Sequence, residues 1–169
     1  MATVRLSFSP YPAHVRTARL VGVAVARRAG VADATLDEVR LAIGEACSRA
    51  VALHRRHALS DPIDVELKDD DQFTVRVTDR APIAAAVTSF RTVSPDSGLP
   101  APIGLLPRPD GVDAFGRTED EMDALSEEDV AVGMGLTLLA GLVEDLSVRP
   151  AQVGVGTEVE MSWPTGTHR

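Results

Sequence analysis

Cysteine is nearly absent from this sequence of 169 residues, because Cys47 is the only one. A single thiol excludes an internal disulfide framework and a zinc site built from several cysteines. Long apolar runs are missing as well, and no stretch approaches the ~20 apolar residues that a membrane-spanning helix needs. The first residues have no apolar signal core, so we expect a cytoplasmic protein that does not bind membranes.

Lysine is also scarce, and the charges are unevenly distributed. Residues 1–60 hold nine Arg against four acidic residues, whereas residues 61–169 hold eight basic against twenty-one acidic ones. The net charge of -8 makes direct nucleic-acid binding a poor hypothesis. The basic N-terminal part leaves open an acidic protein partner.

Apolar periodicity predicts five strands and three helices. The expected elements, in chain order, are a strand at 4–8, helices at 13–29 and 35–56, strands at 63–67 and 73–77, a short helix at 136–142, and strands at 146–148 and 157–163. Thr35 and Glu38 fit a capping box at the start of the second helix. Because consecutive strands are joined by short turns, we expect a mixed, mainly antiparallel sheet with helices on one face. This is an α+β two-layer sandwich.

Residues 82–130 break this periodicity within the expected single domain 1–169. Residues 82–109 hold six of the eleven prolines, and 109–130 hold nine acidic residues against one Arg. A segment of this composition predicts a functional loop or a disordered insert. Trypsin should then cut first at Arg91, Arg108 or Arg117.

Three features suggest chemistry, although each has an ordinary structural explanation. Gly133 and Gly135 precede a helix, where backbone N–H groups can approach a phosphate, but such glycines are commonly only flexible. Glu45 and Arg49 stand four residues apart on a helix, which is also the spacing of a surface ion pair. Asp79 ends a strand, where it could accept a hydrogen bond from a ligand amine or simply form a turn.

Taken in order, and followed by Gly156-Thr157 before the last strand, these features resemble the GHKL ATPase superfamily. The resemblance is greatest to its small bacterial branch of anti-sigma factors with serine kinase activity. It covers roughly residues 4–163 without the insert, and it implies a Bergerat-type sandwich in which 82–130 is a lid-like insert. The stretches that carry it are Leu36–Ser48, Val77–Arg80 and Gly135–Leu139.

The resemblance assigns roles to three polar residues. Glu45 matches the family's catalytic acid, the candidate base, and Asp79 matches the residue that binds the adenine amine. Arg49 stands where the family has the Asn that ligates magnesium, and a guanidinium has no lone pair to give a metal. The sequence therefore predicts no metal-ligating residue and little magnesium dependence. Arg49 would either bring positive charge near the phosphates or pair with Glu45.

The phosphate loop is conserved only in part. The family's Asp-x-Gly-x-Gly motif reads Asp79-Arg80-Ala81-Pro82-Ile83, so both glycines are lost. The candidate nucleotide-binding residues are Arg49, Asp79, Gly133, Gly135, Leu136 and Thr157. ATP or ADP is the implied ligand.

The function implied by the resemblance is regulation of bacterial transcription in the stress response. The protein would sequester a sigma factor and be controlled by an anti-anti-sigma protein. The alternatives are an active protein-serine kinase that phosphorylates the anti-anti-sigma protein, and a stand-alone ATP-binding domain with another protein partner. A homodimer is left open.

Four other residues receive ordinary interpretations. Cys47 lies on the apolar stripe of its helix and is expected in the core. His54 and His57, beside two arginines, are expected at the surface. Trp163, at the end of the last strand, is expected in core or edge packing.

Overall fold

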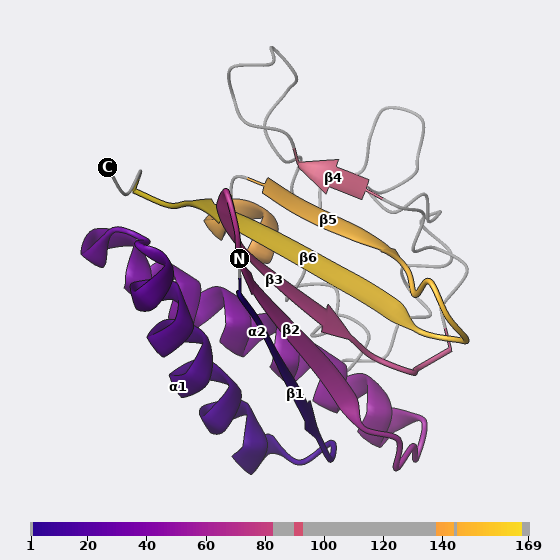
Figure 1. Ribbon diagram of the computed structural model, residues 1–169. Coiled ribbons are helices and arrows are strands. Elements are labelled where there is room, and N and C mark those ends of the chain that lie inside the picture. Colours follow the sequence, from indigo (N-terminus) through magenta and orange to yellow (C-terminus); the bar gives the residue numbers. More distant parts are fainter. Residues whose placement is uncertain (1, 83–89, 93–137, 144, 167–169) are drawn as a thin grey trace.

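A six-stranded sheet and two long helices make up the described part of the computed structural model, which comprises residues 2–82, 90–92, 138–143 and 145–166 (Figure 1). The strands are β1 (Ala2–Phe8), β2 (Ile63–Asp69), β3 (Gln72–Thr78), β4 (Phe90–Thr92), β5 (Asp145–Pro150) and β6 (Thr157–Pro164). The helices are α1 (Pro12–Ala29) and α2 (Leu36–Arg56), with a 3-10 turn, Asp33–Thr35, between them. Residues 138–142 are also helical.

The strands follow the order β1-β2-β3-β6-β5-β4, and every described pair is antiparallel. This confirms the expected α+β fold with a mainly antiparallel sheet. One strand was missed, because β4 lies inside the segment expected to be a loop or a disordered insert. Its three residues are too few to produce a readable alternation, and only their pairing with β5 identifies them.

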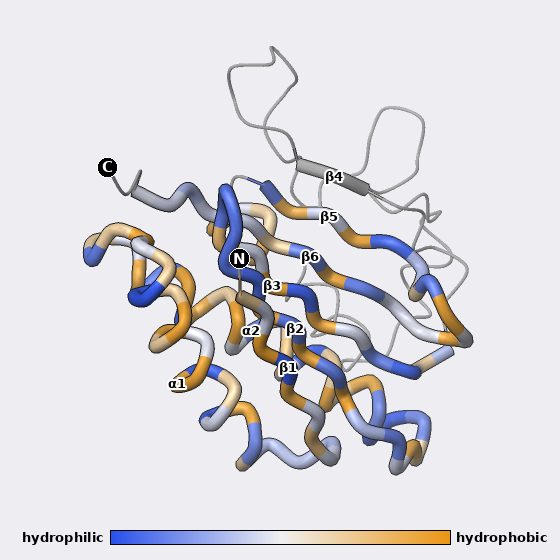
Figure 2. Tube along the Cα trace, viewed as in Figure 1, coloured by the Kyte–Doolittle hydropathy of each residue, from blue (hydrophilic) through white to orange (hydrophobic). Residues whose placement is uncertain are grey.

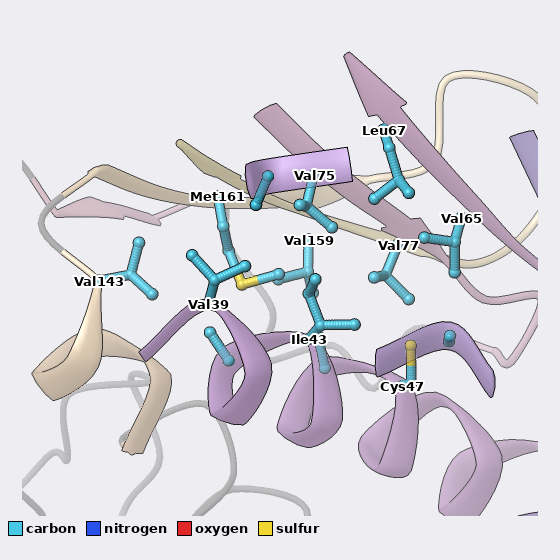
Figure 3. Close-up of a cluster of buried hydrophobic side chains, with 14 of the residues drawn as sticks. Val39, Ile43, Cys47, Val65, Leu67, Val75, Val77, Val143, Val159 and Met161 are labelled. Carbon is cyan, nitrogen blue, oxygen red and sulfur yellow. The ribbon is translucent and has the colours of Figure 1, made fainter. Parts of the chain in front are cut away.

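Both long helices cover the same face of the sheet, which makes two layers (Figure 1; Figure 2). The strands alternate buried and partly exposed side chains, as expected when one face is covered. In Figure 3, Val39, Ile43 and Cys47 of α2 face apolar side chains of the sheet. The labelled sheet residues are Val65, Leu67, Val75, Val77, Val159 and Met161. Cys47 is fully buried, so its core placement is confirmed.

The uncovered face of the sheet carries a network of ion pairs across neighbouring strands. Arg76 of β3 donates to Glu160 of β6 at 2.9 Å and to Glu66 of β2 at 3.3 Å. Glu66 also pairs with Lys68 at 3.0 Å, and hydrogen bonding to Lys68 lowers the pKa of Glu66. Opposite charges on neighbouring strands contribute to the pairing of β2, β3 and β6.

The start of α2 differs from the expected capping box. Thr35 has helical dihedral angles, φ -93° and ψ -14°, and its side chain makes no capping hydrogen bond. The 3-10 turn leads directly into the helix, so Thr35 lacks the extended backbone that an N-cap requires. Glu38 instead accepts a hydrogen bond from Trp163 Nε1 at 2.6 Å and so joins α2 to β6. Trp163 is buried, as expected.

None of the helices in the described residues is long and apolar enough to cross a membrane.

Candidate functional site

Asp79 follows the last residue of β3 and is almost completely buried, with 1% of its surface exposed. Its backbone N–H donates to the carbonyl oxygen of Thr157 at 3.0 Å, which continues the pairing of β3 with β6 by one step. The strand pairing therefore fixes the position of the Asp79 backbone before the chain leaves the sheet.

The Asp79 carboxylate receives three hydrogen bonds. Oδ1 accepts from the backbone N–H groups of Ala81 at 3.0 Å and Thr157 at 3.1 Å. Oδ2 accepts from Nη1 of Arg49 at 3.1 Å. These three donors satisfy the hydrogen-bonding capacity that a buried carboxylate must have met inside the protein.

Arg49 reaches this carboxylate from α2. Its side chain is 4% exposed, and burial lowers the pKa of Arg49 while the charge of Asp79 opposes that change. The guanidinium remains protonated in proteins, so the contact is a buried ion pair. Its Nε atom is buried and has no hydrogen-bond partner in the part of the chain that the structure describes. Such a group costs free energy, so the pair is incompletely satisfied.

The ion pair bears on one of the two alternatives that the sequence left open for Arg49, the pairing with Glu45. Within the described residues, its guanidinium pairs with Asp79 across the interface between helix and sheet, and forms no ion pair with Glu45. Glu45 lies one helical turn earlier on α2 and is half-buried. Helical spacing places Glu45 near the same side of α2 as Arg49.

Gly156 makes the contact between β6 and Asp79 sterically feasible. Its φ of +136° is a conformation that other residues rarely adopt. A Cβ atom at this position would lie 1.9 Å from the carbonyl oxygen of Asp79. The sequence identified Gly156-Thr157 only as a pair preceding a strand. The structure shows that the glycine lets Thr157 donate to Asp79.

His54 is the residue of this region that sequence reasoning misplaced. It was expected at the surface, but its side chain is completely buried. Nε2 accepts from the backbone N–H of Arg80 at 2.8 Å, so Nδ1 carries the proton and donates to the Asp61 carbonyl at 3.1 Å. The signal was present in the spacing, because His54 lies four residues after buried Ala50. The two adjacent arginines, Arg55 and Arg56, instead favoured an exposed position. His57 is exposed, as expected.

Together, His54 and Arg49 connect α2 to the first residues after β3. One side chain holds the Arg80 backbone and the other holds the Asp79 carboxylate. The remaining nucleotide-binding candidates, Gly133, Gly135 and Leu136, lie outside the described residues. Thr157 is buried and contributes its backbone N–H group.

The described residues contain no group of three or more His, Cys, Asp or Glu side chains that could hold a metal ion. The position at which the resemblance implies a magnesium ligand is Arg49, whose guanidinium has no lone pair to give a metal and contacts Asp79 instead. Arg49 therefore does not fit magnesium.

Comparison with known proteins assigns the chain to a family. A search of curated proteins gave no match. The family model described as the histidine kinase-like ATPase domain matches residues 8–163, which is most of the chain. The matched range includes both long helices, the site around Asp79 and nearly the whole of β6. The chain therefore belongs to the histidine kinase-like ATPase domain family.

Proposed function

We propose that this protein is a regulator of the anti-sigma type, which sequesters a sigma factor and is released by an anti-anti-sigma partner. Family membership and the ordered motifs of α2, β3 and β6 support a regulatory ATPase-like domain. The observation that carries the proposal is the Arg49–Asp79 ion pair, because it commits the side chain at the position of the implied metal ligand to an internal contact. Protein binding does not need that metal, so this role is compatible with the altered site.

Adenine nucleotide is the proposed ligand of the Asp79 region. Support comes from the buried carboxylate at the end of β3, whose Oδ2 faces α2, and from the retained Gly156-Thr157 contact. Binding should depend little on magnesium, since Arg49 replaces the metal ligand.

The alternative function, a working protein-serine kinase, has less support. Phosphoryl transfer relies on positioning and on charge stabilisation at the phosphate oxygens, commonly by a bridging metal. Arg49 cannot ligate a metal, and its charge is directed to Asp79. We therefore expect slow phosphoryl transfer or none.

Affinity capture from the native cell tests the proposed partners. Tagged wild-type protein should retain a sigma factor and a small anti-anti-sigma protein, and each purified partner should bind it directly in the absence of nucleotide. Capture and direct binding of neither class would contradict the proposal.

A transfer assay then separates binding from catalysis. The purified partner is incubated with labelled ATP and either wild type or Glu45→Ala, with the exposed Asp37→Ala as a control on the same helix. We expect little label transfer in every case and unchanged partner binding by Glu45→Ala. Efficient transfer by wild type that is abolished in Glu45→Ala but retained in Asp37→Ala would instead establish the kinase.

A further inference from the structure

The Asp79 carboxylate already has an internal partner at the position where a ligand amine would be recognised. Oδ1 is held by two backbone N–H groups, from Ala81 and Thr157. Oδ2 is held by Nη1 of Arg49. With Asp79 only 1% exposed, a ligand has no free, solvated edge of this carboxylate to approach.

We propose that Arg49 is a tethered competitor of adenine nucleotide, whose guanidinium takes the Asp79 oxygen that an adenine amine would use. The inference rests on the nucleotide site proposed above and concerns its regulation. An exocyclic amine and a guanidinium Nη both present N–H donors to a carboxylate oxygen. Arg49 is covalently part of the same domain, so it is present at a high effective concentration.

The pair can nevertheless be opened. Among the described residues, the buried Nε of Arg49 has no hydrogen-bond partner and the guanidinium makes one charged contact, so the pair lacks the bidentate geometry of a strong pair. Displacement of Arg49 would also leave Asp79 supported by its two backbone donors. The structure shows the closed pair. If nucleotide binds only after the pair opens, the apparent affinity is lowered by the fraction of molecules that are closed.

Calorimetric titration with ADP tests the competition directly. The variants are Arg49→Asn and Arg49→Met, which remove the guanidinium. Arg55→Asn is the matched control, because Arg55 lies on the same helix but is exposed. We expect both Arg49 variants to bind ADP about tenfold more tightly than wild type, or better, and Arg55→Asn to bind as wild type does.

Affinities of the Arg49 variants equal to or weaker than that of wild type would overturn the proposal, as would absence of ADP binding by all the proteins. A second measurement needs no substitution at Arg49. In wild type, millimolar ADP should shift the NMR signals of the Arg49 Nε–H group and the Asp79 carboxylate, because the pair opens. ADP that leaves both signals unchanged, or that does not bind, contradicts the competition.

These outcomes are separate from the fate of the partner proposal. Failure of the competition would leave the partner-binding role intact, since partners are captured without nucleotide. Conversely, the Arg49 variants could gain tenfold in ADP affinity while affinity capture yields no sigma-type partner. Arg49 would then still be a competitor of nucleotide, in a domain with another function.

Discussion

At the scale of single residues, the region around Asp79 consists of buried polar side chains, each of which makes at least one specific hydrogen bond. Asp79 has three donors, His54 uses both ring nitrogens, and Arg49 meets Asp79 across the interface. Buried polar groups cost free energy unless they are hydrogen-bonded, so each of these contacts constrains the conformation of the site. We therefore expect a buried polar residue to contribute far more to stability than an exposed residue of the same type.

His54 of α2 and His57, which directly follows α2, provide a matched pair of substitutions. Replacing His54 with Ala should lower the free energy of unfolding by about 3 kcal/mol, because it leaves a cavity and orphans the Arg80 N–H and the Asp61 carbonyl. Replacing the exposed His57 should change it by less than about 0.5 kcal/mol. Urea denaturation measures both. Equal effects of the two substitutions would show that His54 is not buried as described.

Cys47 should be inert in the folded protein. Burial raises the pKa of its thiol from 9.0 to about 12, so the reactive thiolate is absent at neutral pH. Because the folded-state pKa is raised, the stabilising effect of the protonated thiol persists below pH 9.0 and is lost as the pH rises from there towards about 12. A thiol-reactive dye at pH 8 should label Cys47 only after denaturant is added. Rapid labelling without denaturant would contradict its place in the core.

At the scale of elements, the end of β3 and the beginning of β6 form one unit. Asp79 and Thr157 exchange hydrogen bonds in both directions, backbone to backbone and backbone to carboxylate. Gly156 allows this approach because it carries no Cβ. This unit positions the Asp79 carboxylate against α2. Any change that separates β3 from β6 at this point should therefore break the Arg49–Asp79 ion pair.

Gly156→Ala tests this unit. The new Cβ would meet the Asp79 carbonyl at 1.9 Å, in a backbone conformation unfavourable for alanine. We expect a loss of about 3 kcal/mol or more in the free energy of unfolding. Gly141→Ala is the control, since its Cβ would have no neighbour within 4 Å, and alanine in a helix should stabilise by up to about 1 kcal/mol. Similar melting curves for the two variants would contradict the close approach.

The elements themselves could be predicted because their patterns are local. The apolar stripe of α2 and the alternation in β2 and β3 each extend over several residues and follow from burial of one face. The capping box failed because its spacing says nothing about backbone dihedral angles, and Thr35 proved to be helical. Glu38 found a partner 125 residues away, Trp163, which no local pattern indicates.

At the scale of the whole molecule, the helix layer and the sheet are joined at their interface by polar as well as apolar contacts. The sequence identified Asp79 and Arg49 as candidates through the order of motifs, but not that they contact each other. Their pairing depends on how α2 lies across β3, and the two residues are 30 positions apart. Tertiary packing therefore determines the state of the site, in which the guanidinium of Arg49 is bound to the Asp79 carboxylate.

The closed site can be tested with the unfolding free energies of Arg49→Met, Asp79→Asn and the double variant. Removing one partner of a buried ion pair typically costs about 3–5 kcal/mol, because the other charge is left unpaired. The double variant should therefore be about as stable as either single variant, which corresponds to a coupling free energy of about 3 kcal/mol. The exposed pair of Arg40 and Asp37, 3.0 Å apart on α2, serves as the control and should couple by less than about 0.5 kcal/mol. Additive effects of the Arg49 and Asp79 substitutions, within about 0.5 kcal/mol, would contradict the ion pair on which the account of this site depends.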